Sequence, residues 1–373
     1  MARRARIAAI VVVLAGAAAW MVVGRSAGLA GRTPATDHAP LARVLQQYGI
    51  PAASQVLVFS KTSLQRDRIS VTNPRAIYFN DRAAVGWVPG SPTLEVATFD
   101  GSQNGVAFYT VDVSDGASRV RRGDQCFECH ALPGAGGLQG LVMRSAGVRR
   151  AEHRCFEDIE DRTPYALRWG GWFVTGSQVP AGHVGRTQLP AFERSYLQPG
   201  SDVVALLILG HQVSVTNLIA RLGREVRLAD LDVEAGRAAD TLAMQARVNE
   251  LADTMLFLDE APLPGRLAGA SAFRRVFEAQ GVRDEHGHSL RSLDLTRRLL
   301  LVPCSFMIHA PIFRALPTRA RQAVYARISD RLVSTEPGVR ARLSSDDREA
   351  IVHILQATVP DLPSHFGSVA TVS

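Results

Sequence analysis

A run of five residues, Cys126-Phe127-Glu128-Cys129-His130, constrains this chain more than any other feature of its sequence. Two thiols three positions apart on a helical turn can each add to one vinyl group of a haem, and the histidine that follows is placed to bind the iron. With four cysteines and ten histidines in 373 residues, about 10⁻³ such motifs are expected by chance. The motif therefore predicts one covalently bound haem c, attached to Cys126 and Cys129, with His130 as the proximal iron ligand.

The first thirty residues have the layout of an export signal. Three arginines before residue 7 precede an uncharged apolar run, 7–23, and mostly small residues follow as far as Ala30. The run is within the length range of a membrane span, and Arg25 is unusual before a cleavage site. A cleaved signal peptide and a retained N-terminal membrane anchor therefore both stay open. Each of them predicts a periplasmic or periplasm-facing protein, the compartment in which bacteria attach haem covalently.

Composition excludes other classes of protein. The mean hydropathy of +0.03 is too low for a polytopic membrane protein. The formal charge is +7, but the first thirty residues contribute four arginines and no acidic residue. The small excess that remains gives no reason to expect nucleic acid as a partner.

The order of apolar segments predicts an α+β fold. After a linker over 31–50, which includes a short helical piece, short strands are expected at 56–59, 76–79, 84–88, 94–99, 106–113 and 169–174. Helices are expected at 203–221, 233–259, 270–279, 317–332 and 345–358. We therefore predict an antiparallel, β-rich haem-attachment region over 51–200 and a helical region over 201–373, with one c-type haem between them.

Four further blocks make the chain recognisable. They read FSKTSLQRDRISVTNPRAIYFND over 59–81, VGWVPG over 85–90, RWGGWFVTG over 168–176 and SDVVALLILGHQ over 201–212. Together with the Cys-x-x-Cys-His motif, they resemble an uncharacterised bacterial family of exported, single-haem, cytochrome-c-like proteins. The resemblance covers most of the mature chain and implies haem binding and electron transfer, with no established substrate.

The second axial ligand of the iron is the open question. His183 lies in a loop rich in glycine and proline, where the resembled family tends to read His-Met-Gly-Asn and this chain has His-Val-Gly-Arg. His211 lies within the apolar helix, where it must be hydrogen-bonded or bound to iron. Met143 follows a glycine-rich turn and is a third candidate. A position without a protein ligand is the fourth possibility.

Two residues are candidates for the haem pocket. Arg168 can pair with a haem propionate, and the indole of Trp169 can pack against the edge of the porphyrin. The alternative for both is a role in the protein core. Trp172 fits the core better.

The rival to haem is a structural zinc site. Cys126, Cys129, His153 and Cys155 have the ligand types of such a site, although this interpretation leaves His130 without a role. Cys155 and Cys304 either form a disulfide or stay as separate buried thiols.

If haem is bound, three functions compete. The first is electron transfer between periplasmic or membrane-bound redox proteins, with both axial positions filled. The second is catalysis by a peroxidase or a small-molecule oxidoreductase, which needs an open iron position. The third is a sensor module. We expect the first, and the sequence leaves open whether the protein is an enzyme.

Overall fold

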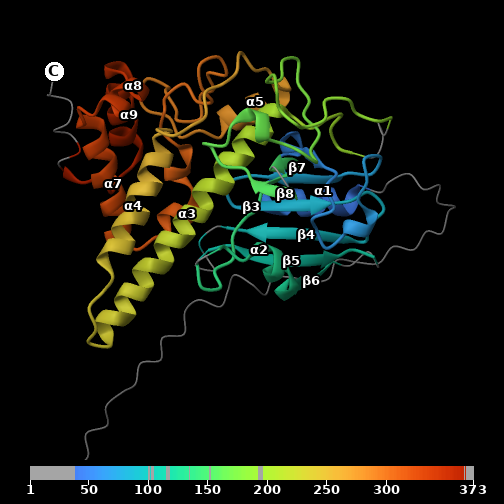
Figure 1. Cartoon of the computed structure of the whole chain (residues 1–373), viewed down its shortest axis with the longest axis horizontal. Coiled ribbons are helices and arrows are strands. Elements are labelled where there is room, and N and C mark those ends of the chain that lie inside the picture. The colour runs from blue at the N-terminus through green and yellow to red at the C-terminus, as the bar shows by residue number, and fades with distance from the viewer. Residues whose placement is uncertain are drawn as a thin grey trace, which may run out of the picture. The chain divides into compact units, whose positions relative to one another are not determined.

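An antiparallel sheet fills the N-terminal half of the described chain and helices fill the C-terminal half (Figure 1). The computed structural model describes residues 38–99, 101, 105–114, 118–133, 135–150, 153–191, 196–364 and 366. These residues belong to one compact unit that spans 36–373. The α+β class is therefore confirmed, whereas the expected export segment over 1–30 lies outside the described residues.

The main sheet has six strands, and each strand pairs with its neighbours in the sequence. Its members are β1 (Val56–Val58), β2 (Arg75–Phe79), β3 (Ala83–Trp87), β4 (Thr93–Thr98), β5 (Ala107–Asp112) and β6 (Arg119–Arg122). The first five match the strands expected before residue 114. A separate hairpin consists of β7 (Arg144–Arg150) and β8 (His153–Asp158).

The two faces of the main sheet belong to different hydrophobic clusters, because successive side chains of a strand point to opposite faces. Leu57 and Tyr78 belong to the cluster that includes residues of helix α1 (Ala39–Tyr48). Val58, Phe79 and Phe108 belong to the larger cluster that includes the helical half. The sheet is therefore the layer on which both α1 and the C-terminal helices rest.

The helical half is built around α3 (Val203–Glu234), which Asp202 caps by accepting a hydrogen bond from the Ala205 N–H at 2.8 Å. Figure 1 shows α3 running beside α4 (Thr241–Met255) and α7 (Thr318–Val333). By length and composition α3 could span a membrane, but 78% of its apolar window is buried in the fold. The remaining helices are α5 (Ser271–Ala279), α6 (Pro311–Arg314), α8 (Pro337–Arg342) and α9 (Ser345–Thr358).

Short helical pieces complete the list of elements. They are α2 (Phe127–His130) and the 3₁₀ turns η1 (Ala52–Ser54), η2 (Arg66–Arg68), η3 (Asp124–Cys126), η4 (Tyr165–Leu167) and η5 (Phe306–His309). The haem motif spans the junction of η3 and α2.

Two expected elements differ in the structure. The helix expected over 233–259 begins only at Thr241, because α3 continues to Glu234. Leu242, expected on the inner side, is therefore 82% exposed. The strand expected over 169–174 is not formed, because Trp169 and Gly171 have φ values of 69° and 84°, which interrupt an extended chain.

Candidate haem-attachment site

The Cys-x-x-Cys-His segment lies against the sheet, directly after β6. The rings of His130 and Phe108 are 4.2 Å apart between centroids, and Cys126 packs against the larger core cluster. Cys126 is partly buried and Cys129 is exposed, and both thiols are free. Burial, and next the charge of Glu95, raises the pKa of Cys126.

A closed loop follows the motif. The Gly140 N–H donates to the His130 carbonyl at 2.9 Å, and the Leu132 N–H donates to the Leu138 carbonyl at 2.9 Å. Asn217 of α3 holds the end of the loop, because its amide accepts from the Leu141 N–H and donates to the Leu141 carbonyl, both at 2.8 Å. A Cβ at Gly140 would lie 2.6 Å from the Asn217 side-chain oxygen, so this close approach requires glycine.

The loop also sets the tautomer of His130. Its Nδ1 lies 2.9 Å from the Gly140 carbonyl oxygen, which can only accept, so Nδ1 carries the proton. The lone pair of Nε2 is then free, and none of the described residues hydrogen-bonds this atom. Burial lowers the pKa of His130 and so favours the neutral imidazole, the form that binds metals.

A small hollow adjoins the motif on the side of β1 and β2. Cys129 and His130 line it together with Arg75, Arg144 and Trp172, and its volume is about 50 Å³. Ordinary small-molecule pockets have volumes of about 300–1,000 Å³. Enclosure of a whole haem between the sheet and the helices therefore stays a prediction.

Arg75 is a pocket residue that our reasoning from the sequence missed. It forms an ion pair with Glu95, yet Arg75 Nε and Glu95 Oε1 are buried and have no hydrogen-bond partner among the described residues. A Cβ at Gly86 would collide with the Arg75 guanidinium, so the glycine lets this side chain lie across β3. Arg75 lies two residues before Ile77, so the two side chains point to the same face of β2. The sequence gives no other sign that Arg75 lines the hollow.

These observations fit covalent haem attachment. Two free thiols lie one helical turn apart, and the adjacent histidine has a free Nε2. Arg75 lines the same hollow as Cys129 and His130, and its Nε has no hydrogen-bond partner among the described residues. The attachment residues are therefore suited to the group that the motif predicts.

His183 has the opposite tautomer. The Gly185 N–H donates to His183 Nδ1 at 3.0 Å, so the proton of a neutral ring lies on Nε2. Its ring contacts Trp169, with 5.4 Å between centroids, and burial lowers its pKa. Because the protonated Nε2 has no lone pair, this arrangement does not offer Nε2 to an iron.

His211 has both ring nitrogens engaged. Nδ1 lies 2.7 Å from Asp161 Oδ2, and Nε2 lies 2.7 Å from Ser305 Oγ. The ring is fully buried and stacks on Phe257 at 4.4 Å. In this arrangement His211 is a satisfied core histidine, which is the alternative to its role as a ligand.

Met143 is buried and turned away from the hollow at His130. Its neighbours Val142 and Arg144 line that hollow, whereas the Met143 sulfur lies 3.7 Å from where a Cβ of Gly210 on α3 would be. The structure therefore does not bring any of the three expected distal ligands into the hollow that contains His130.

Arg168 and Trp169 do not line the hollow either. Arg168 donates to the carbonyl oxygens of Thr163 and Asp161, at 2.7 and 2.6 Å, and stacks over the ring of Tyr165. Trp172 lines the hollow instead, and its indole N–H donates to the Arg144 carbonyl at 2.7 Å.

The other cysteine predictions are only partly accessible. The side chains of His153 and Cys155 lie outside the described part of the structure, so the zinc alternative stays a prediction. Of the two expectations for Cys304, the structure shows the separate buried thiol and not the disulfide. Cys304 is a buried free thiol, and burial raises its pKa to about 12.

The chain was compared with known proteins in three ways. No family model, no curated protein and no solved structure matches it. Membership of the family of single-haem proteins, which the blocks of the sequence suggest, therefore stays a prediction.

Proposed function

We propose that the chain is an exported c-type haem protein that transfers electrons between periplasmic or membrane-bound redox proteins. Cys126 and Cys129 attach the haem, and His130 binds its iron through Nε2. The single observation that supports this most strongly is the hydrogen bond between His130 Nδ1 and the Gly140 carbonyl. It fixes the tautomer and the ring plane that an iron-binding imidazole needs, directly beside two free thiols.

Access from solvent supports electron transfer. Cys129 is exposed, and the neighbouring Phe127 is 41% exposed. Bound haem would supply a one-electron couple, and attachment here would keep one edge of it within reach of a partner. A buried motif would not allow such contact.

The edge strand β6 is a candidate docking surface for that partner. All four of its residues are exposed, and three of them are arginines. It is the last strand of the sheet and leads within a few residues to Cys126. A positive edge beside the haem would steer an acidic redox protein toward it.

A second candidate function is chemistry on a small molecule at the iron. Two observations favour it, namely the Nε2-protonated tautomer of His183 and the two occupied nitrogens of His211. If neither ring rearranges, His130 is the one strong axial ligand from these three histidines, and the second position of the iron admits a diatomic molecule or a small substrate.

A visible spectrum with and without carbon monoxide tests both functions. If neither His183 nor His211 rearranges, the reduced protein, made with a c-haem maturation system, should bind carbon monoxide readily. That result would favour small-molecule chemistry over electron transfer with both axial positions filled. An unchanged low-spin spectrum would instead mean that a second protein ligand is bound, and would leave electron transfer as the proposed function.

Two variants identify any second ligand. His183→Ala and His211→Ala should both keep the spectrum of the parent protein, since we assign neither ring to the iron. A shift to high spin in one of them would contradict our assignment for that residue. The other variant serves as its matched control.

A further inference from the structure

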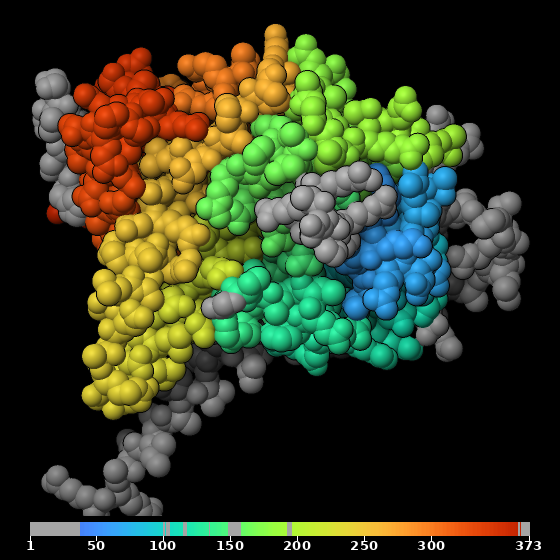
Figure 2. All heavy atoms as spheres, viewed as in Figure 1, coloured from blue at the N-terminus to red at the C-terminus, as the bar shows by residue number. Residues whose placement is uncertain are grey.

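A well-formed cavity lies on the side of the motif loop that faces the helices. It has a volume of about 370 Å³, which is within the range of small-molecule sites. Its walls come from residues 131–133, the segments 141–144 and 158–162, α3, and α4 with the chain that follows it. Figure 2 shows the recess between the parts of the surface coloured teal, green and yellow. Cys126, Cys129 and His130 do not line it.

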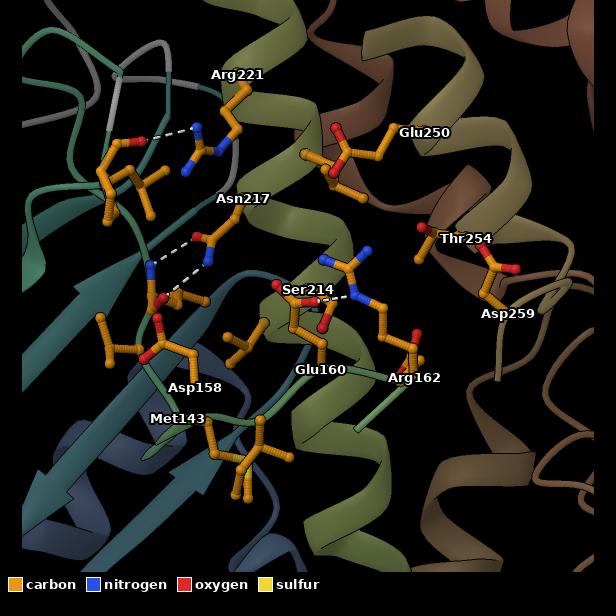
Figure 3. A pocket seen from close by; sticks show the side chains of 18 of the residues that line it. Met143, Asp158, Glu160, Arg162, Ser214, Asn217, Arg221, Glu250, Thr254 and Asp259 are labelled. Atoms are coloured by element: carbon orange, nitrogen blue, oxygen red, sulfur yellow. Dashed lines mark hydrogen bonds and ion pairs between the residues drawn. The ribbon is translucent and has the colours of Figure 1, made fainter. Parts of the chain in front are cut away.

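The arginines of this cavity already have partners. Each of the four is paired, and the pairs are Arg144 with Asp158, Arg162 with Glu160, Arg247 with Glu250, and Arg221 with the Pro133 carbonyl. Figure 3 shows the pairs of Arg162 and Arg221 at the wall. A carboxylate therefore neutralises three of the four, whereas Arg221 donates to a neutral carbonyl and keeps its charge.

Three carboxyl groups in the cavity wall have no such partner. Among the described residues, Asp161, Asp259 and Glu260 form no ion pair with an arginine. The Ala261 N–H donates to the Asp161 carbonyl at 2.9 Å, which brings Glu260 beside Asp161. The wall therefore offers carboxyl oxygens that no arginine occupies.

Asp161 is held from behind by a chain of hydrogen bonds through the core. The Asp161 carboxylate can only accept, so His211 Nδ1–H donates to it, and Nε2 of the neutral ring accepts the proton of Ser305 Oγ. Ser305 Oγ in turn accepts from the Met307 N–H. The order of residues is that of a serine hydrolase, but Ser305 is fully buried and lines no cavity described here. The chain therefore orients the Asp161 carboxylate and does not provide a nucleophile.

An aromatic ring packs against the histidine that bonds this carboxylate. Phe257 lines the cavity and stacks on His211, with ring centroids 4.4 Å apart. Aromatic faces attract cations, and a desolvated carboxylate beside such a ring strengthens that preference. Leu141, Met143 and Val213 give the floor an apolar part, and most of the remaining lining is polar or charged.

We propose that this cavity binds a small organic cation of the alkylammonium class, with its charged end between Asp161, Glu260 and the ring of Phe257. Its alkyl chain lies on the apolar part of the floor. The proposal does not depend on haem binding, because no attachment residue lines the cavity.

Cation binding is coupled to the proton of Glu260. Burial, and next the charge of Asp161, raises the pKa of Glu260 to about 8, against the opposing charges of Arg168, Arg342 and Arg298. At pH 7 the free protein therefore holds this proton, and an ammonium group displaces it. Binding should release protons at pH 7 and become tighter as the pH rises toward 9.

Titration calorimetry of the full chain tests the proposal with three probes of equal length. They are n-butylammonium, n-butanol and butyrate, each measured at pH 7 in two buffers with different ionisation enthalpies. We expect n-butylammonium to bind with release of protons, and n-butanol and butyrate to bind at least about fivefold more weakly. Butyrate that binds as tightly as n-butylammonium, or no binding of n-butylammonium, would overturn the proposal.

Two matched variants locate the site. Glu260→Gln should weaken n-butylammonium about fivefold or more and abolish proton release, whereas Glu160→Gln, at the rim, should change affinity less than twofold. Asp161→Asn gives a second variant of the inner pair if Glu260→Gln does not fold. Equal effects of the inner and rim variants would contradict the assignment.

Discussion

At the scale of single residues, the partner of one ring nitrogen distinguishes three histidines that look alike in the sequence. His130 Nδ1 faces a carbonyl, His183 Nδ1 faces an N–H, and His211 contacts Asp161 and Ser305. The motif alone predicts that His130 is an iron ligand. The carbonyl partner of its Nδ1 is only ten residues away, on the following loop. The partners of His211 are 50 and 94 residues away. Helical spacing predicts that His211 is buried but cannot supply those partners.

Glu260 gives a prediction about pH at the same scale. Its pKa is about 8 in the folded protein, above the usual value, so the folded state binds this proton more tightly than the unfolded state. Glu260 therefore favours the folded state least above pH 8, and its contribution to stability falls as the pH rises from about 5 to 8. We expect Glu260→Gln to flatten this fall in the free energy of unfolding measured by denaturant titration. Parallel pH curves for the variant and the parent would contradict it.

At the scale of elements, α3 is both the core helix and the support of the motif loop. Asn217 bonds both backbone groups of Leu141, and Arg221, one turn later, donates to the Pro133 carbonyl at 3.1 Å. The apolar run and the Asp202 cap predict where α3 begins. Its polar contacts with a loop more than 70 residues earlier could not be predicted, because they depend on how the two halves pack.

Asn217→Ala tests this support. The change leaves the Leu141 N–H and carbonyl without partners, so we expect the free energy of unfolding to fall by about 1–3 kcal/mol. The amide of Leu141 should also exchange with solvent faster. Ser214→Ala is the matched control one turn earlier, because Ser214 only donates to the Gly210 carbonyl of its own helix. A loss for Asn217→Ala no larger than for Ser214→Ala would show that α3 does not hold the loop.

At the scale of the whole molecule, the sheet presents one face to α1 and the other to the helical half, with the motif at an edge. The sequence predicts β1 to β5 because their apolar residues alternate or run together. It does not predict β6, because all four residues of this strand are exposed and only backbone pairing with β5 defines it.

The central claim is covalent attachment of one haem through Cys126 and Cys129. The most direct measurement is the intact mass of the denatured protein after expression with a c-haem maturation system, with Cys126→Ala/Cys129→Ala as the control. We predict that the parent chain keeps the added mass of one haem after denaturation and that the double variant does not. A parent chain without that added mass, or one that instead retains zinc through native purification, would contradict the account.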